Sequence, residues 1–116
     1  MHADTRPSTA ASDVIIVLTT LPAEADAEAF AEALVAERLA ACVGVGGPMT
    51  SVYTWQGAVE RARERQVVIK TVRARLPLIE ARLADLHPNE VPELLALPVA
   101  GGGAANLARV RESTAG

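Results

Sequence analysis

The sequence predicts an α+β fold of the ferredoxin-like type, with the element order β-α-β-β-α-β and a short additional helix near the C-terminus. Three observations lead to this prediction. A continuous run of β-branched residues comes first, two amphipathic helical stripes are separated by a long hairpin pattern, and another extended segment follows the second stripe. Two right-handed β-α-β units that share one antiparallel sheet produce such a plait.

The first part of the pattern is a strand followed by a helix. Residues 13–20 form a short apolar run that is typical of a strand buried on both faces. We expect Pro22 in the first turn of a helix, where its missing N–H costs nothing. The helix should span residues 24–38, with these apolar side chains at helical spacing: Ala27, Phe30, Ala31, Leu34 and Val35.

The middle of the chain has the pattern of an extended hairpin. Residues 39–45 are apolar, nearby glycines indicate a bend or bulge, and residues 49–55 resume a strand. Gln56-Gly57 supplies a turn, and a third strand should run over residues 59–72. Residues 60–65 are highly charged, so the tip should project beyond the core, although the same residues taken alone also fit a helix.

The last third of the sequence predicts a second helix, an edge strand and a short final helix. Leucine and isoleucine side chains at helical spacing place the second helix at residues 75–86, and Pro88 ends it. Residues 93–99 read as a fourth strand, whose flanking prolines indicate the edge of a sheet. After a Gly-rich loop, residues 104–111 form the last helix.

Length and composition indicate one domain. The chain has 116 residues, of which 50% are hydrophobic, enough to build a core without disulfides or a structural metal. We expect residues 1–12 to be a disordered leader and residues 13–116 to form the domain. A net charge of −3 argues against nucleic-acid binding. No apolar run suits a membrane span and no signal peptide is visible, so we expect a cytoplasmic protein.

Catalytic machinery is scarce, so we do not expect an enzyme. The Gly-rich stretch 101–103 lacks the Lys-Ser/Thr pair of a nucleotide-binding loop, and there is no Gly-x-Ser-x-Gly nucleophile turn. Cys42 lies in an apolar run, where a buried cysteine acts as a small hydrophobe. The competing interpretation is a soft metal ligand, or a nucleophile paired with His87.

A polar loop after the second helix offers another candidate site. His87, Glu90 and Glu93 lie within seven residues of proline-stiffened chain. A histidine with two carboxylates suits metal binding or proton transfer. Helix capping and loop structure are the alternative, and a metal site here would need ligands from elsewhere in the fold.

Tyr53, Trp55 and Lys70 are the remaining candidates. The two aromatic residues lie two apart in one strand, so they share a face, which marks either a core or a contact surface. We expect the projecting hairpin to pack on another subunit. Lys70 interrupts an apolar strand, so it either pairs with Glu64 or Glu90 or contacts an anionic ligand.

Four segments together resemble the CutA family of divalent-cation tolerance proteins. They are AERLAACV at 36–43, SVYTWQG at 51–57, VVIKT at 67–71, and HPNEVPE at 87–93 with Leu97-Pro98 after it. Each segment alone is a weak signal, but their order and spacing are specific. The resemblance covers nearly the whole chain outside the predicted leader.

This resemblance implies a ferredoxin-like fold and a tight homotrimer, with long hairpins between subunits and an architecture like that of the PII signalling proteins. It also implies a link to tolerance of copper and other divalent cations, with no accepted enzymatic reaction. The family's polar cluster lies in a cleft between subunits, with Cys42 as the recurrent cysteine. By position it corresponds here to Tyr53, Trp55, Glu64, Lys70, His87 and Glu90.

The sequence departs from the family pattern at three places, one of which is the turn after Trp55, which reads Gln-Gly-Ala where acidic and lysine side chains are common. Asn89 stands where the family usually has tyrosine, and residues 106–110 lack the usual tyrosine and tryptophan. These changes leave the expected fold and trimer unaffected. The changes at 89 and 106–110 remove aromatic walls of the expected cleft, so a ligand that stacks on those rings is less favoured.

Two functions are therefore expected. The first is a trimeric protein of copper tolerance that binds Cu(II) or another divalent cation through Cys42, His87 and Glu90. The second is a PII-like regulatory module that holds a small anion between subunits, near the positive charges of Lys70, Arg73 and Arg75. Neither needs an organic cofactor. In both, the cleft is expected to include Tyr53, Trp55, Glu64, Lys70 and Glu93.

Overall fold

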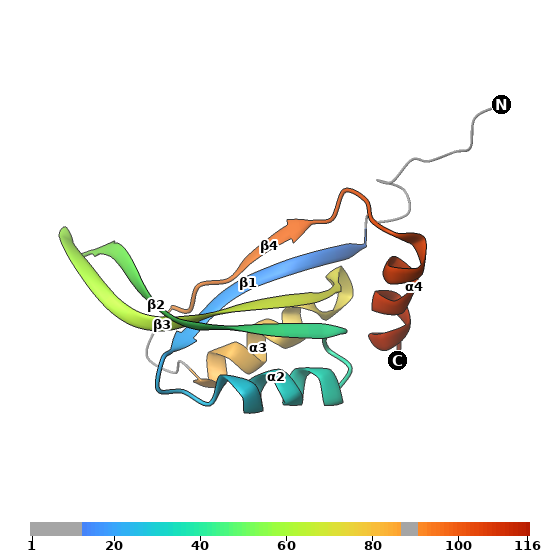
Figure 1. Cartoon of the computed structure of the whole chain (residues 1–116), viewed down its shortest axis with the longest axis horizontal. Helices are drawn as coiled ribbons and strands as arrows, with labels where there is room; N and C mark the ends of the chain where they lie inside the picture. The colour runs from blue at the N-terminus through green and yellow to red at the C-terminus, as the bar shows by residue number, and fades with distance from the viewer. Residues whose placement is uncertain (1–12, 87–90) are drawn as a thin grey trace.

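A four-stranded antiparallel sheet with helices on one face forms the body of the molecule (Figure 1). The computed structural model describes residues 13–86 and 91–116, so the predicted leader at 1–12 lies outside the described residues. The predicted ferredoxin-like α+β fold is confirmed, including the extra C-terminal helix. The elements are β1 (Val14–Pro22), α2 (Ala27–Ala36), β2 (Cys42–Trp55), β3 (Ala58–Val72), η1 (Arg73–Arg75), α3 (Leu76–Leu86), β4 (Leu95–Pro98) and α4 (Ala104–Ser113).

The strands lie in the order β2-β3-β1-β4. The central strands β1 and β3 pair antiparallel along the whole of β1, from Val14 opposite Val72 to Pro22 opposite Glu64. The predicted edge strand is confirmed as β4, which is shorter than expected because it pairs with β1 only from Leu95 to Pro98.

The main core lies between one face of the sheet and the helices α2 and α3 (Figure 1). Its buried side chains include Ile15, Val17, Val67 and Ile69 from the strands and Phe30, Leu34, Ile79 and Leu83 from the helices. Alternation along a strand sends every second side chain into this core. The remaining strand side chains therefore face the opposite side of the sheet.

The predicted start of the first helix is wrong. Pro22 ends β1 opposite Glu64, and α2 begins only at Ala27. The physical reason is the cap: the Asp26 side chain accepts a hydrogen bond from the Ala29 backbone N–H at 3.0 Å, which satisfies a free donor of the first turn. Proline is tolerated at the end of a strand, so the chain remains extended up to that point.

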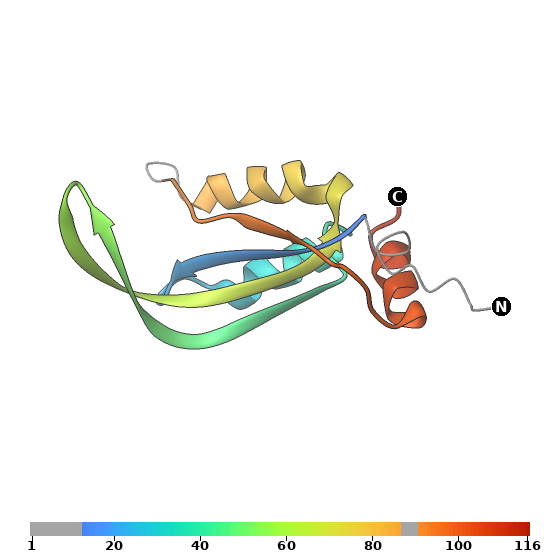
Figure 2. The same ribbon diagram turned by 90° about the horizontal axis from the view of Figure 1, so that it is seen from above.

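The long hairpin extends beyond the core, as predicted. Its distal part, residues 48–63, is called the arm below, and it gives the molecule a long axis of 57 Å (Figures 1 and 2). Every residue from 58 to 65 has a partner on β2, so the charged stretch is a strand and the helical alternative is excluded. The register shifts between Val45 and Pro48, where the predicted irregularity occurs.

The C-terminal helix α4 covers one end of the sheet. Leu107 and Val110 pack with Val14 in a second, smaller apolar cluster. The Arg111 guanidinium donates to both carboxylate oxygens of Asp13 at 2.9–3.1 Å, and this hydrogen bonding lowers the pKa of Asp13. Arg75 donates to the Thr114 carbonyl. Among the helices of residues 13–86 and 91–116, none has the length and apolar character to span a membrane.

Candidate functional site

No helix layer among the described residues covers the face of the sheet opposite α2 and α3 (Figure 2). The register places Ile16 and Leu18 of β1 beside Leu97 and Leu95 of β4. Leu95 and Leu97, on the edge strand β4, are 57% and 48% exposed, which is high for leucines paired in a sheet. We call this surface the open face.

Cys42 and Lys70 lie directly opposite each other on the open face. Their strands, β2 and β3, pair in register at this point, and Lys70 also faces Ile16 of β1. Cys42 is exposed in the single chain, so the interpretation of this residue as a buried small hydrophobe is wrong. The reason is its place on an edge strand, on the side of the sheet away from the helices.

Tyr53 and Trp55 share one face of the arm, as predicted. They lie opposite Glu60 and Ala58 and are 45% and 60% exposed. Because alternation is continuous along β3, this face of the arm is the same side of the strand as Lys70. The aromatic pair therefore lies outside the core of its own chain.

Glu64 does not pair with Lys70 within one chain. The two residues are six positions apart on β3, about 20 Å at roughly 3.3 Å per residue. Glu64 instead accepts a hydrogen bond from the Thr20 hydroxyl at 3.2 Å. Tyr53, opposite Glu60, is further still from Lys70. A single chain thus separates these predicted cleft residues into two groups. Tyr53, Trp55 and Glu64 lie on the arm or next to it and form the arm group, while Cys42 and Lys70 lie together on the open face.

Of the candidate site residues in the loop after α3, the structure describes Glu93. His87 and Glu90 lie outside the described residues. Glu93 has an exposed side chain, and its backbone carbonyl accepts a hydrogen bond from the buried Thr19 hydroxyl at 2.6 Å. This bond fixes the start of β4 against β1. Within residues 13–86 and 91–116, no three His, Cys, Asp or Glu side chains are grouped so that they could hold a metal ion.

One of the cations expected near the cleft is held by hydrogen bonds to the end of α4. Arg75 was expected to contribute positive charge to the cleft, but its guanidinium donates to the Thr114 carbonyl at 2.7 and 2.9 Å. It therefore helps to hold the end of α4. Lys70 makes no ion pair with any of the described residues, so its ammonium group is the available charge on the open face.

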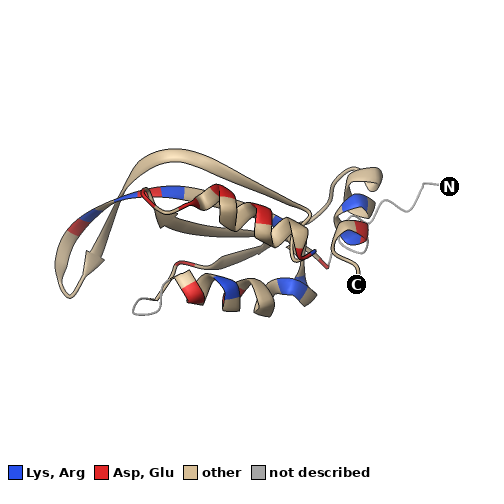
Figure 3. Ribbon diagram, turned by 90° about the horizontal axis from the view of Figure 1, so that it is seen from below, with Lys and Arg blue, Asp and Glu red and all other residues tan. Residues whose placement is uncertain are grey.

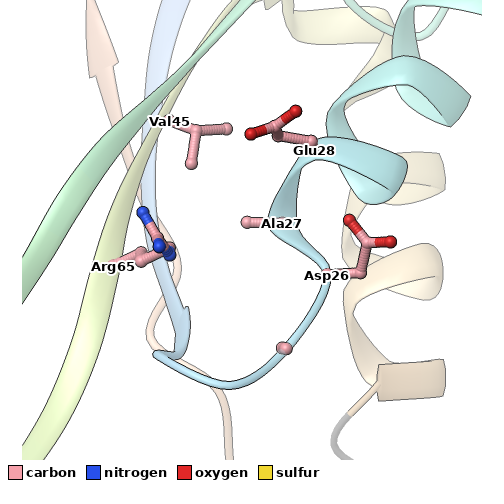
Figure 4. A pocket seen from close by; sticks show the side chains of 6 residues that line it. Asp26, Ala27, Glu28, Val45 and Arg65 are labelled. Atoms are coloured by element: carbon pink, nitrogen blue, oxygen red, sulfur yellow. The ribbon is translucent and has the colours of Figure 1, made fainter.

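A hollow that the sequence did not indicate lies between the base of the arm and the first turn of α2 (Figure 4). It has a volume of about 200 Å³. Arg65 and Val45 form one wall, and Asp26, Ala27 and Glu28 form the other. Strand alternation predicts the side of β3 on which Arg65 lies, but only the packing of α2 creates the hollow.

Comparison with known proteins places the chain in a family. The sequence profile described as CutA1 divalent ion tolerance protein matches residues 15–113. The chain belongs to the CutA family. The divalent-cation tolerance protein CutA of Thermus thermophilus is 44% identical over 99 residues, which are 85% of this chain and 96% of that protein. Human CutA is 39% identical over 101 residues, covering 87% of this chain and 56% of that protein.

Solved CutA structures share the fold. The Thermus thermophilus protein superposes with a TM-score of 0.82 at 44% identity, covering 87% of this chain and 98% of that one. CutA1 from Oryza sativa gives a TM-score of 0.82 at 32% identity, covering 90% and 96%. CutA from Synechococcus elongatus, solved in complex with a Bis-Tris molecule, gives 0.79 at 34% identity, covering 88% and 94%.

Proposed function

We propose that this CutA-family chain acts in divalent-cation tolerance as a homotrimer that binds Cu(II) between its subunits. One observation carries the proposal: the open face is apolar, yet it bears Cys42 and Lys70 directly opposite each other. A second chain packed on this face would bury its leucines and bring new side chains to the cysteine. The family's link to divalent-ion tolerance supports the choice of ligand.

Assembly is supported by the separation of the candidate residues. The arm group lies too far along β3 to reach Lys70 of its own chain, and it projects beyond the core. The arm of one copy can reach the open face of another. Burying exposed leucines there is favourable by about 25 cal/mol for each Å² of apolar surface removed from water. We therefore propose that the cleft forms only in the trimer.

Copper is supported by the kind of ligand available. Copper favours sulfur and imidazole donors over carboxylates alone, which agrees with Cys42 and His87, with Glu90 as a third candidate ligand. Cys42 is accessible on the open face. Because the described residues group no three such donors, a complete site needs Cys42 to be joined by His87 and Glu90, from the same chain or another. We propose binding rather than catalysis as the activity.

Native mass spectrometry of the purified protein, titrated with Cu(II) and with Zn(II), tests this proposal. We expect a trimer that takes up about one copper per subunit and loses it in Cys42→Ser and in His87→Ala. Glu80→Gln is the matched control, because Glu80 is exposed on α3 in the helix layer. A trimer in which both variants retain copper would refute these ligands, and a monomer would refute the assembly.

The second candidate function is regulatory binding of a small anion. The observation that favours it is Lys70, whose charge is not neutralised by the described residues and opposes a bare cation beside Cys42. In this case the same titration would show a trimer with only weak, indiscriminate copper uptake. Small anions would then raise the melting temperature by mass action, and Lys70→Met would abolish that rise.

A further inference from the structure

The distal half of β3 separates its charges by face. Glu60 and Glu64 point to the side that carries Tyr53 and Trp55, whereas three arginines point to the opposite side. Figure 3 shows the acidic and basic residues that follow one another along this part of the arm. The arginines are two residues apart, which spaces them by roughly 6.6 Å along the strand. They are Arg61, Arg63 and Arg65.

The arginines have no carboxylate opposite them on β2. Their partners on β2 are Val52, Thr50 and Pro48. Arg63 donates to the Thr50 hydroxyl at 3.3 Å, and Arg65 donates to the Gly46 carbonyl at 3.2 Å, so both have neutral acceptors. Arg61 makes no hydrogen bond or ion pair within residues 13–86 and 91–116. Arg61 and Arg63 are therefore exposed cations without an ion pair among the described residues, whereas Arg65 is half-buried.

The same part of β3 has an open backbone edge. Pairing with β1 ends at Glu64, and the last bond on that side joins the Ala23 N–H to the Arg63 carbonyl at 3.0 Å. The N–H and C=O of alternate residues point to the same side of an antiparallel strand. The backbone groups of Arg61 and Val59 therefore point to the free edge, where no described strand pairs with them.

We propose that an acidic, extended protein segment adds as a strand to this free edge of the arm, with alternate Asp or Glu side chains facing Arg61 and Arg63. Strand addition would satisfy the open backbone groups, and the two-residue period of the added strand would match the arginine spacing. Carboxylates accept charge-assisted hydrogen bonds from arginine, often in pairs. Arg65 lies outside the contact, because it is half-buried at the base of the arm and donates to the Gly46 carbonyl, beside the hollow that Asp26 and Glu28 also line (Figure 4).

A protein segment fits this surface better than a single-stranded nucleic acid. Such nucleic acids are held by bases that stack on aromatic side chains beside a basic groove. Here the aromatic residues of the arm, Tyr53 and Trp55, lie on the opposite face from the arginines. The net charge of −3 also disfavours a long polyanion, while a short acidic segment needs only the local charge.

Fluorescence polarisation with a labelled eight-residue peptide of alternating Glu and Thr tests the proposal on the full-length protein. We expect saturable binding at 50 mM salt that weakens at 300 mM. Arg61→Glu should weaken it about tenfold, and the double variant with Arg63→Glu should abolish it. The matched control is Arg109→Glu, the same charge change at an exposed position on α4, which should leave binding unchanged. A peptide with four Thr followed by four Glu should bind at least fivefold more weakly.

Four results would overturn the proposal. The first is no binding of the alternating peptide at 50 mM salt, and the second is equal loss of binding in Arg61→Glu and Arg109→Glu. The third is tighter binding of a thymidine oligonucleotide that depends on Arg61, which would make the surface a nucleic-acid contact. The fourth is a change of molar mass in the double variant by light scattering, which would make it a contact between copies of this chain.

Discussion

Arg38 shows how a single residue fastens the C-terminal helix to the rest of the fold. It follows α2 in the left-handed region, with φ at 61°, a conformation that costs a residue with a Cβ atom about 1–2 kcal/mol. Its guanidinium donates to the carbonyls of Glu112 and Ala115 at 2.6 and 2.7 Å. Glu112 lies in the last turn of α4 and Ala115 just after it, so the side chain ties the end of this helix to the segment that follows α2. The strained backbone is thus offset by the bonds that the side chain makes.

Substitution of Arg38 separates the two effects. Arg38→Ala retains the strain and removes both hydrogen bonds, so it should lower the free energy of unfolding by about 1–2 kcal/mol. Arg38→Gly removes the same bonds but relieves the strain, so it should cost about 1 kcal/mol less. Urea unfolding at one fixed protein concentration measures both, with Arg109→Ala as a near-neutral control. Equal losses for alanine and glycine would show that the backbone at this position is not strained.

At the scale of elements, the arm depends on its turn. Gln56 and Gly57 both have positive φ, at 49° and 81°, as expected for the two-residue turn that matches the twist of a hairpin. Glutamine is an unusual residue at the first of these positions, where asparagine is favoured. Most of the arm is paired only between β2 and β3, so the turn has a larger share in its stability than it would have in the core.

Gly57→Ala should therefore open the arm. An alanine at φ of 81° costs about 1 kcal/mol, which corresponds to roughly fivefold faster amide hydrogen exchange across residues 52–61. Gly47→Ala provides the control, because Gly47 is on the same hairpin, has open space around its Cα and has no positive φ. Unchanged exchange in Gly57→Ala would mean that contacts outside the turn hold the arm closed.

The sequence predicts elements better than it predicts the site, for physical reasons. The buried run of β1 and the helical stripe of α3 have local periods, so their types are correct. The predicted start of α2, with Pro22 in its first turn, is wrong because Asp26 caps the helix and α2 begins at Ala27. The burial of Cys42 depends on which side of the sheet the helices cover, and no local pattern contains that information. The alternation of β3 predicts that the arginines share one face. The free edge beside them could not be predicted, because it depends on where the pairing with β1 ends, which is at Glu64.

At the scale of the whole molecule, the two faces of the sheet differ in whether helices cover them. Helices α2 and α3 cover one face, while the open face presents Leu95 and Leu97 beside Ile16 and Leu18 (Figures 1 and 2). An exposed, contiguous apolar face on a sheet usually marks an interaction surface. Both edge strands, β2 and β4, border it. The proposed trimer gives this face a partner.

A pair of leucines tests whether the open face holds the assembly together. Leu97 on β4 and Leu78 on α3 are each 48% exposed, but they lie on opposite layers of the fold. A buried carboxylate without a partner is costly, so Leu97→Glu should convert the trimer to a monomer in size-exclusion chromatography with light scattering. Leu78→Glu makes the same chemical change on the helix layer and should leave the molar mass unchanged. If Leu97→Glu also kept its mass, the subunits would have to meet through another surface, and Cys42 would remain open to solvent.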